Sequence, residues 1–117
     1  MERLRKRADF VAAASGAKVP AVNFVLQARD RRDTGSVRVG FTVSKKVGNS
    51  VERNRVRRRL REVVRLTPEA ALRPGHDYVL IGRRAALKAD FQQLKIEYQR
   101  ALARLGASSR PAKQNAN

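Results

Sequence analysis

Residues 51–65 carry apolar side chains at the spacing of one helical face. The apolar positions are Val56, Leu60, Val63 and Val64, which recur at i, i+4, i+7 and i+8. This spacing is typical of an amphipathic helix with one buried side. Gly48, Asn49 and Ser50 precede the stretch, and these residue types favour turns and helix N-caps. The pattern therefore predicts a helix that begins near residue 50 and packs against a core.

Other stretches have the period of a β-strand. Val22–Arg29 is largely apolar, and Val37–Val43 alternates between apolar and polar or small residues. The apolar side of the second stretch consists of Val37, Val39, Phe41 and Val43. Because a polar turn at 30–36 separates the two stretches, we expect them to form an antiparallel hairpin. Asp77–Gly82 is a continuous apolar run, as expected for a central strand covered on both faces.

Helices are predicted near both ends of the chain. Asp9 is a candidate N-cap for a short first helix, which carries Phe10. Asp90 and Gln93 have the spacing of a capping box, and an apolar stripe at helical spacing continues to Gly106. Residues 107–117 lack apolar content, and we expect this tail to be disordered.

The predicted order is helix, strand, strand, helix, strand, helix, with room for one further short strand. Strands mixed with helices in a chain of 117 residues indicate a single α+β domain, which we place at residues 1–106. The helix between the second and third long strands allows a βαβ crossover if those strands are parallel. The general rule for such crossovers favours the right-handed form.

The charge of the chain points to a polyanionic partner. Twenty-seven lysines and arginines face ten acidic residues, so the formal net charge is +17. A hydrophobic content of 42% is too high for a wholly disordered basic protein. No apolar run is long enough to span a bilayer, and we expect no membrane partner. The absence of cysteine excludes disulfides and cysteine metal sites, and it fits a cytoplasmic protein.

Arginine dominates the predicted helix at 51–65. Seven arginines face two glutamates in this stretch, whereas a solvated helix face normally mixes both signs. One stripe at helical spacing consists of Asn54, Arg58, Arg61 and Arg65, and Arg57 flanks it. Arg58 and Glu62 at i,i+4 are expected to pair. We expect Arg53, at the edge of the apolar face, to be partly buried and to bond nearby backbone. The stripe predicts nucleic-acid binding.

The chain lacks the residues for catalysis of its own. His76 is the only histidine and is expected in an exposed loop, so no serine–histidine–aspartate set can form without it. We identify no catalytic residue and no metal site in the protein. Aromatic residues are few, which favours recognition of backbone and shape. Phe10 either packs the first helix onto the core or stacks on a base, and the residues alone favour packing.

One long motif resembles a known family. The run from Val43 to Arg58, with Arg53-Asn54-Arg55 at its centre, is similar to the signature of the bacterial ribonuclease P protein subunit. The resemblance extends over about residues 3–105. It includes Asp9-Phe10, the strand at 37–43 and the strand that begins at Asp77. A lone Arg-Asn-Arg would be a weak signal, whereas this long run with flanking strands in the right order is specific.

The resemblance implies both a fold and a function. The fold is a compact two-layer α-β-β-β-α-β-α sandwich with a left-handed βαβ crossover. The function is that of the protein subunit of ribonuclease P, an endoribonuclease that removes the 5′ leader of precursor tRNA. The chemistry and the magnesium ions are implied to reside mainly in the RNA subunit and substrate. The implied partners are that catalytic RNA and precursor tRNA, with one protein per RNA.

The resemblance also assigns roles by position. Residues implied to bind RNA are Lys45, Lys46, Arg53, Asn54, Arg55, Arg57, Arg58, Arg61, Arg65, Arg83 and Arg84. Phe10 and Arg3 match residues of a cleft for the single-stranded leader. This chain departs from the family pattern at Ala14, where relatives often have an aromatic residue, and at Gln27, where some relatives have one. Arg59 stands where relatives often have an aliphatic residue.

Two alternative functions are compatible with the composition. A non-enzymatic structural RNA-binding protein, such as a ribosomal protein, would also be small and strongly basic. A membrane-active cationic protein is disfavoured by the ordered core pattern. The motif at 44–58 distinguishes the ribonuclease P hypothesis from both.

Overall fold

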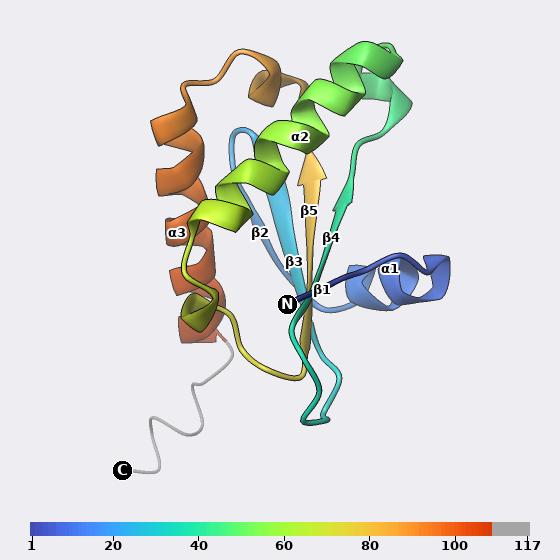
Figure 1. Cartoon of the computed structure of the whole chain (residues 1–117), viewed down its shortest axis with the longest axis vertical. Helices are drawn as coiled ribbons and strands as arrows, with labels where there is room; N and C mark the ends of the chain where they lie inside the picture. The colour runs from blue at the N-terminus through green and yellow to red at the C-terminus, as the bar shows by residue number, and fades with distance from the viewer. Residues whose placement is uncertain (109–117) are drawn as a thin grey trace.

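The structure, a computed structural model, describes residues 1–108 and contains one five-stranded sheet and three α-helices (Figure 1). The strands are β1 (Glu2–Arg3), β2 (Ala17–Pro20), β3 (Phe24–Asp30), β4 (Arg38–Thr42) and β5 (His76–Gly82). The helices are α1 (Arg7–Ala14), α2 (Ser50–Leu66) and α3 (Phe91–Ser108). The predicted α+β class and the α-β-β-β-α-β-α order are confirmed, and the two-residue β1 is added in front.

The strand order in the sheet is β1-β4-β5-β3-β2. β5 lies at the centre, parallel to β4 and antiparallel to β3. The predicted hairpin between β3 and β4 is therefore wrong, because β5 lies between these two strands. Tyr78, Val79 and Leu80 are buried on both faces of the sheet, which favours the central position for β5. The hairpin that does form joins β2 to β3.

The β4–α2–β5 crossover is left-handed. In Figure 1 both strands run upward, α2 passes in front of them, and β5 lies to the left of β4. A right-handed crossover would place β5 on the other side of β4. The general rule for crossovers thus fails here, and the handedness that the family resemblance implied is confirmed.

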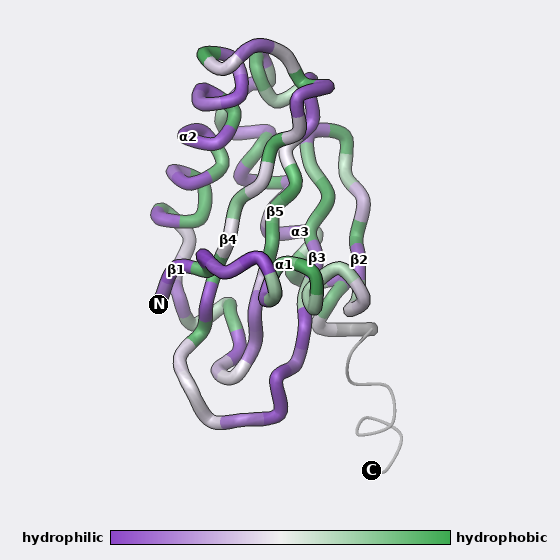
Figure 2. Tube along the Cα trace, turned by 90° about the vertical axis from the view of Figure 1, so that its right-hand side faces the viewer, coloured by the Kyte–Doolittle hydropathy of each residue, from purple (hydrophilic) through white to green (hydrophobic). Residues whose placement is uncertain are grey.

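The main core lies between the sheet and the helices α2 and α3. Val56, Leu60 and Val63 of α2 are fully buried there, as the helical spacing predicted, together with Leu80 of β5. Figure 2 shows the hydrophobic side of α2 turned toward the strands and its hydrophilic side turned away. Tyr98 from α3 is also fully buried in this core.

A smaller core holds α1 against the opposite face of the sheet. Leu4, Ala13 and Val79 are buried in it, and Phe10 and Ile81 are packed against them. Val79 and Leu80 are neighbours in β5, so their side chains point to opposite faces. The sheet therefore carries α2 and α3 on one face and α1 on the other, so the helices form a layer on each side of it and the two-layer part of the expectation does not hold.

Two helix boundaries differ from the prediction. Lys6 is the N-cap of α1, with no side-chain cap bond, so the assignment of Asp9 as the cap is wrong. Asp9 lies in the first turn, where its carboxylate is 3.4 Å from the Arg38 guanidinium. α3 continues two residues beyond the expected end at Gly106, to Ser108. The rest of the predicted disordered tail lies outside the described residues.

Candidate nucleic-acid interface

The start of α2 is fixed by a capping box. The Asn49 side chain accepts a hydrogen bond of 2.8 Å from the backbone N–H of Glu52. The Glu52 carboxylate accepts one of 3.0 Å from the backbone N–H of Asn49. This second hydrogen bond is the main reason why the pKa of Glu52 lies below its ordinary value. The reciprocal pair sets where the arginine-rich helix begins.

The outer face of α2 is strongly basic, as the sequence predicted. Asn54, Arg58 and Arg65 are exposed, and Arg57 is partly buried. Arg57 donates a hydrogen bond of 2.7 Å to the Asn54 amide oxygen. The structure therefore brings this part of the predicted stripe together on one solvent-facing surface.

The predicted pairing of Arg58 with Glu62 is wrong. Glu62 instead accepts two hydrogen bonds from Arg65, one of them 2.9 Å long from Nε. The hydrogen bonds from Arg65 are the main reason why the pKa of Glu62 is lowered. Because Glu62 is engaged in this pair, Arg58 has no acidic partner within residues 1–108. Its charge is available to an external anion.

Arg61 lies over an aromatic ring of the sheet. Its guanidinium carbon is 5.9 Å from the centroid of the Phe41 ring, within the range of a cation–π contact. The Nε atom of Arg61 is buried and has no hydrogen-bond partner. Burial first, and then the nearby charges of Arg3, Arg57 and Arg58, lower the pKa of Arg61. These guanidinium groups are thus close enough to repel one another.

Of the other arginines of α2, two donate hydrogen bonds to the backbone of the rest of the protein, and a third is partly buried. Arg55 Nε donates a hydrogen bond of 3.2 Å to the Leu87 carbonyl oxygen, and Arg59 donates one to the Ala89 carbonyl oxygen. Arg53 is partly buried, as expected, but its Nε has no hydrogen-bond partner. Arg55 and Arg59 therefore tie α2 to the segment before α3.

The lysine loop and the end of β5 flank the N-terminus of α2. Lys45 and Lys46 are exposed in a single 3₁₀ turn (Lys45–Val47). Arg83 is also exposed. Arg84 donates a hydrogen bond to the Val47 carbonyl oxygen and lies 3.5 Å from the Glu52 carboxylate. Arg84 thus holds the lysine loop against α2.

The two residues predicted for the leader cleft point to opposite faces of the sheet. Phe10 is partly exposed and belongs to the small core under α1. Arg3 pairs with Val39 in the sheet register, and Val39 is buried in the main core on the α2 face. Because directly paired residues share a face, Arg3 lies with α2 and not with Phe10.

The two positions where this chain departs from the family pattern, Gln27 and Ala14, belong to the α1 side of the sheet. Gln27 is buried and pairs with Val79, so it lies on the same face as Phe10. Ala14 is exposed at the end of α1. Phe10 rests on Gly40, where an added Cβ would come within 2.7 Å of two ring carbons. A glycine at position 40 is thus required for this packing of the aromatic ring.

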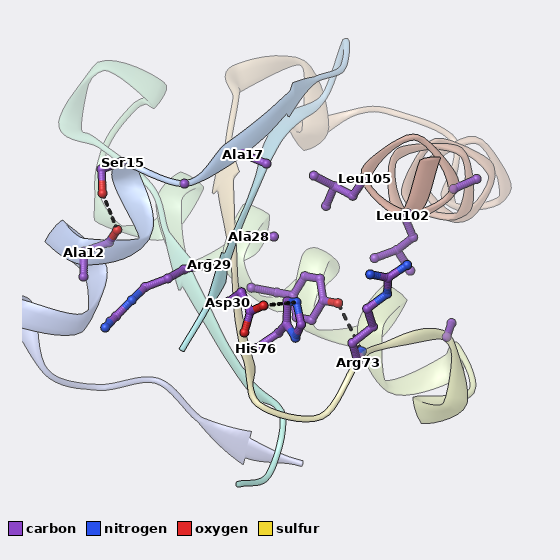
Figure 3. A pocket seen from close by; sticks show the side chains of 15 residues that line it. Ala12, Ser15, Ala17, Ala28, Arg29, Asp30, Arg73, His76, Leu102 and Leu105 are labelled. Carbon is purple, nitrogen blue, oxygen red and sulfur yellow. Dashed lines mark hydrogen bonds and ion pairs between the residues drawn. The ribbon is translucent and has the colours of Figure 1, made fainter. Parts of the chain in front are cut away.

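A hollow of about 920 Å³ lies beside His76 (Figure 3). His76 was expected in an exposed loop, but it is partly buried at the start of β5 and stacks on Tyr78, with ring centroids 6.1 Å apart. Its Nε2 is 4.0 Å from the Asp30 carboxylate, and its Nδ1 is 3.0 Å from the Pro74 carbonyl oxygen. Small side chains such as Ala17 and Ala28 line much of the hollow.

Residues 1–108 contain neither a cluster of metal-ligating side chains nor a membrane-spanning helix. Nowhere in this range do three or more histidine, cysteine, aspartate or glutamate side chains gather as a possible metal site. None of the helices in the same range is both long and apolar enough to cross a membrane.

Sequence reasoning missed two features of this interface. It assigned Phe41 to the apolar side of a strand, and the ring is in fact only partly buried beneath Arg61. It also missed β1, which places Arg3 near Arg61. The alternation of Arg3 with Leu4 was the available signal, because it places these two neighbours on opposite faces of any strand that they form.

Comparison with known sequences identifies close relatives. The family model described as ribonuclease P matches residues 1–106. The ribonuclease P protein component of Gluconacetobacter diazotrophicus is 50% identical over 105 residues, which cover 89% of this chain and 90% of the relative. That of Ruegeria pomeroyi is 50% identical over 108 residues, which cover 89% of this chain and 86% of the relative.

Comparison with solved structures gives the same family. The ribonuclease P protein from Thermotoga maritima superposes with a TM-score of 0.74 at 28% identity, covering 89% of this chain and 97% of that one. The Staphylococcus aureus protein superposes with a TM-score of 0.72 at 28% identity, covering 88% and 94%. These similarities support the α+β fold, and none of them favours a ribosomal protein.

Proposed function

The chain belongs to the ribonuclease P protein family, and from this premise we propose that it promotes endonucleolytic removal of the 5′ leader from precursor tRNA. In this proposal it is the protein subunit of a ribonucleoprotein enzyme, and the RNA subunit carries the chemistry. The partnership with the ribonuclease P RNA follows from the family. The contact with precursor tRNA and the ratio of one protein per RNA are part of the proposal.

The observation that carries the proposal is the unneutralised basic face of α2. Arg58 is exposed without an acidic partner in the described chain, and Arg57 and Arg61 lie close to it. Lys45 and Lys46 extend the same positive surface at the start of the helix. Such a surface gains free energy when it releases the counterions condensed on RNA phosphates. The arginine fork also matches the two oxygens of a phosphate.

In this proposal the protein and the magnesium ions have different roles. The magnesium ions that the family uses are proposed to be held mainly by the RNA subunit and the substrate. The basic residues of this chain lower the repulsion between the RNA strands that meet at the enzyme. On the α1 face, the partly exposed Phe10 is proposed to contact the single-stranded leader. The proposed location is the cytoplasm.

Reconstitution tests this function directly. The protein is mixed with a bacterial ribonuclease P RNA at low magnesium concentration, and 5′-leader cleavage of a precursor tRNA is followed. We expect cleavage only when both components are present. Tight RNA binding without cleavage would contradict the proposal and would favour a structural RNA-binding protein.

A further inference from the structure

A second hollow lies between β1 and α2, next to the arginine stripe. Its volume is about 190 Å³. Its apolar wall is formed by Val39, Phe41 and Val64, and the arginines at its rim are Arg3, Arg61 and Arg65. The hollow therefore combines an apolar surface with several guanidinium groups, and the family resemblance gave no role to Phe41.

The short strand β1 creates this arrangement. β1 pairs with β4 at only two positions, and its last residue, Arg3, lies opposite Val39. Phe41 is two residues beyond Val39, so it lies on the same face but past the end of β1. The ring is partly exposed for this reason. The Met1 ammonium forms an ion pair with the Glu69 carboxylate at 3.3 Å, and this pair holds the beginning of the strand.

The positive charge in the hollow is only partly neutralised by the described part of the chain. Arg61 lies near Arg3, and its buried Nε has no hydrogen-bond partner. Glu62 is engaged by Arg65, which leaves Glu2 as the acidic side chain that lines the hollow. Bringing guanidinium groups together without an anion costs free energy, and a bound phosphate offsets this cost.

We infer that the hollow binds one nucleotide of the catalytic RNA, with its phosphate between Arg3 and Arg61 and its base against Phe41. The inference rests on the proposed function and adds β1 and Phe41 to the RNA-binding surface. We assign the nucleotide to the catalytic RNA because the hollow opens on the α2 face. Phe10 and α1, the proposed leader contact, lie on the other face of the sheet.

Arg3→Ala and Phe41→Leu separate the two halves of the site. Arg3→Ala is expected to weaken binding of the catalytic RNA several-fold and to reduce the salt slope by about one unit, as for one phosphate contact. Phe41→Leu removes no charge, so it is expected to weaken binding about fivefold with an unchanged slope. The control is Arg100→Ala, which removes one exposed charge from α3. Thermal melting shows whether each variant is folded.

The readouts distinguish this inference from the proposed function. Wild-type protein that fails to support cleavage would contradict the function itself. If the wild type supports cleavage but Arg3→Ala changes RNA affinity and salt slope no more than Arg100→Ala, the nucleotide site is refuted. A loss confined to leader-bearing precursor tRNA, with binding of the catalytic RNA unchanged, would refute the assignment to that RNA. A double variant whose loss is smaller than the product of the single losses would support one shared nucleotide.

Discussion

Arg38 binds the buried carboxylate of Asp77 through two parallel hydrogen bonds, each 2.8 Å long. The Asp77 side chain is fully buried, and Arg31 donates a further hydrogen bond of 2.6 Å to it. Arg38 is in β4 and Asp77 in β5, at paired positions of the parallel register. The ion pair therefore fixes how the two strands of the left-handed crossover meet, at the end of the sheet away from the lysine loop.

Asp77→Asn should lower the stability of the fold. The amide leaves two guanidinium groups without their carboxylate, which is costly in a buried position. We expect the free energy of unfolding to fall by about 2 kcal/mol, below the range for fully buried pairs because the Arg38 side chain is 25% exposed. Urea unfolding followed by circular dichroism measures the change. Asp33→Asn is the control, because this exposed carboxylate also binds Arg31, and its loss should be clearly smaller.

The contribution of Asp77 should depend on pH. Burial alone would raise the pKa of its carboxyl group, but the hydrogen bonds from Arg38 and Arg31 outweigh burial and hold the pKa below the ordinary value of 3.8. A pKa that is lower in the folded state stabilises the fold above the unfolded-state pKa, and the effect is lost as the pH falls through the folded-state pKa. We therefore expect the stability difference between wild type and Asp77→Asn to be constant near neutral pH and to shrink below about pH 4. A difference that persists or grows in acid would contradict a stabilised carboxylate.

Local features of this chain were predictable, and contacts between distant segments were not. The buried face of α2 and its Asn49 cap follow from helical spacing and capping chemistry, which involve residues a few positions apart. The apolar run at Asp77–Gly82 predicted a central strand, but its two neighbours, β4 and β3, could not be read from the order of the elements along the chain. The Arg38–Asp77 pair follows only once that strand order is known.

The candidate site divides in the same way. The exposed position of Arg58 was predictable from the helical stripe. Glu62 pairs with Arg65 and not with Arg58, and this depends on side-chain conformations that sequence spacing alone does not determine. The alternation of Arg3 with Leu4 indicates that the two side chains point to opposite faces, but a strand of only two residues is too short for the sequence to show which strand it pairs with.

Arg58 and Arg59 form a matched pair that separates RNA binding from stability. Arg58→Ala should weaken RNA binding and reduce the salt slope by about one unit, with little change in stability. Arg59→Ala should lower the free energy of unfolding by about 1 kcal/mol, because it removes the hydrogen bond to the Ala89 carbonyl oxygen. Filter binding over a range of salt concentrations and urea unfolding measure the two effects. Equal salt slopes for the two variants would contradict the assignment of Arg58 as a phosphate contact.

Gly48→Ala should disturb the helix cap and the lysine loop together. Gly48 has φ of 155°, and an added Cβ would lie 2.1 Å from the Glu52 carboxylate oxygen. The capping box cannot keep its geometry around such a contact, so we expect a loss of about 1 kcal/mol in the free energy of unfolding. Binding of the catalytic RNA should fall as well, since the loop carries Lys45 and Lys46. Asn49→Ala is the comparison, because it removes the cap without straining the backbone at position 48.

Phe10 provides the test of the leader contact. Phe10→Leu keeps an apolar side chain in the small core but removes the flat ring on which a base can stack. We expect the dissociation constant of the holoenzyme for precursor tRNA to rise about fivefold, with little change for mature tRNA, which lacks the leader. Gly40→Ala should act in the same direction, because its Cβ would displace the Phe10 ring.

Val11→Ala is the control for this experiment, since Val11 neighbours Phe10 on α1 and is 61% exposed. It should leave the affinity for both tRNAs unchanged if stacking by Phe10 is the cause. Equal losses of affinity for precursor and mature tRNA in Phe10→Leu would assign Phe10 to packing alone. A loss for precursor tRNA alone, shared by Gly40→Ala, would place the leader on the α1 face, because both substitutions act on the Phe10 ring.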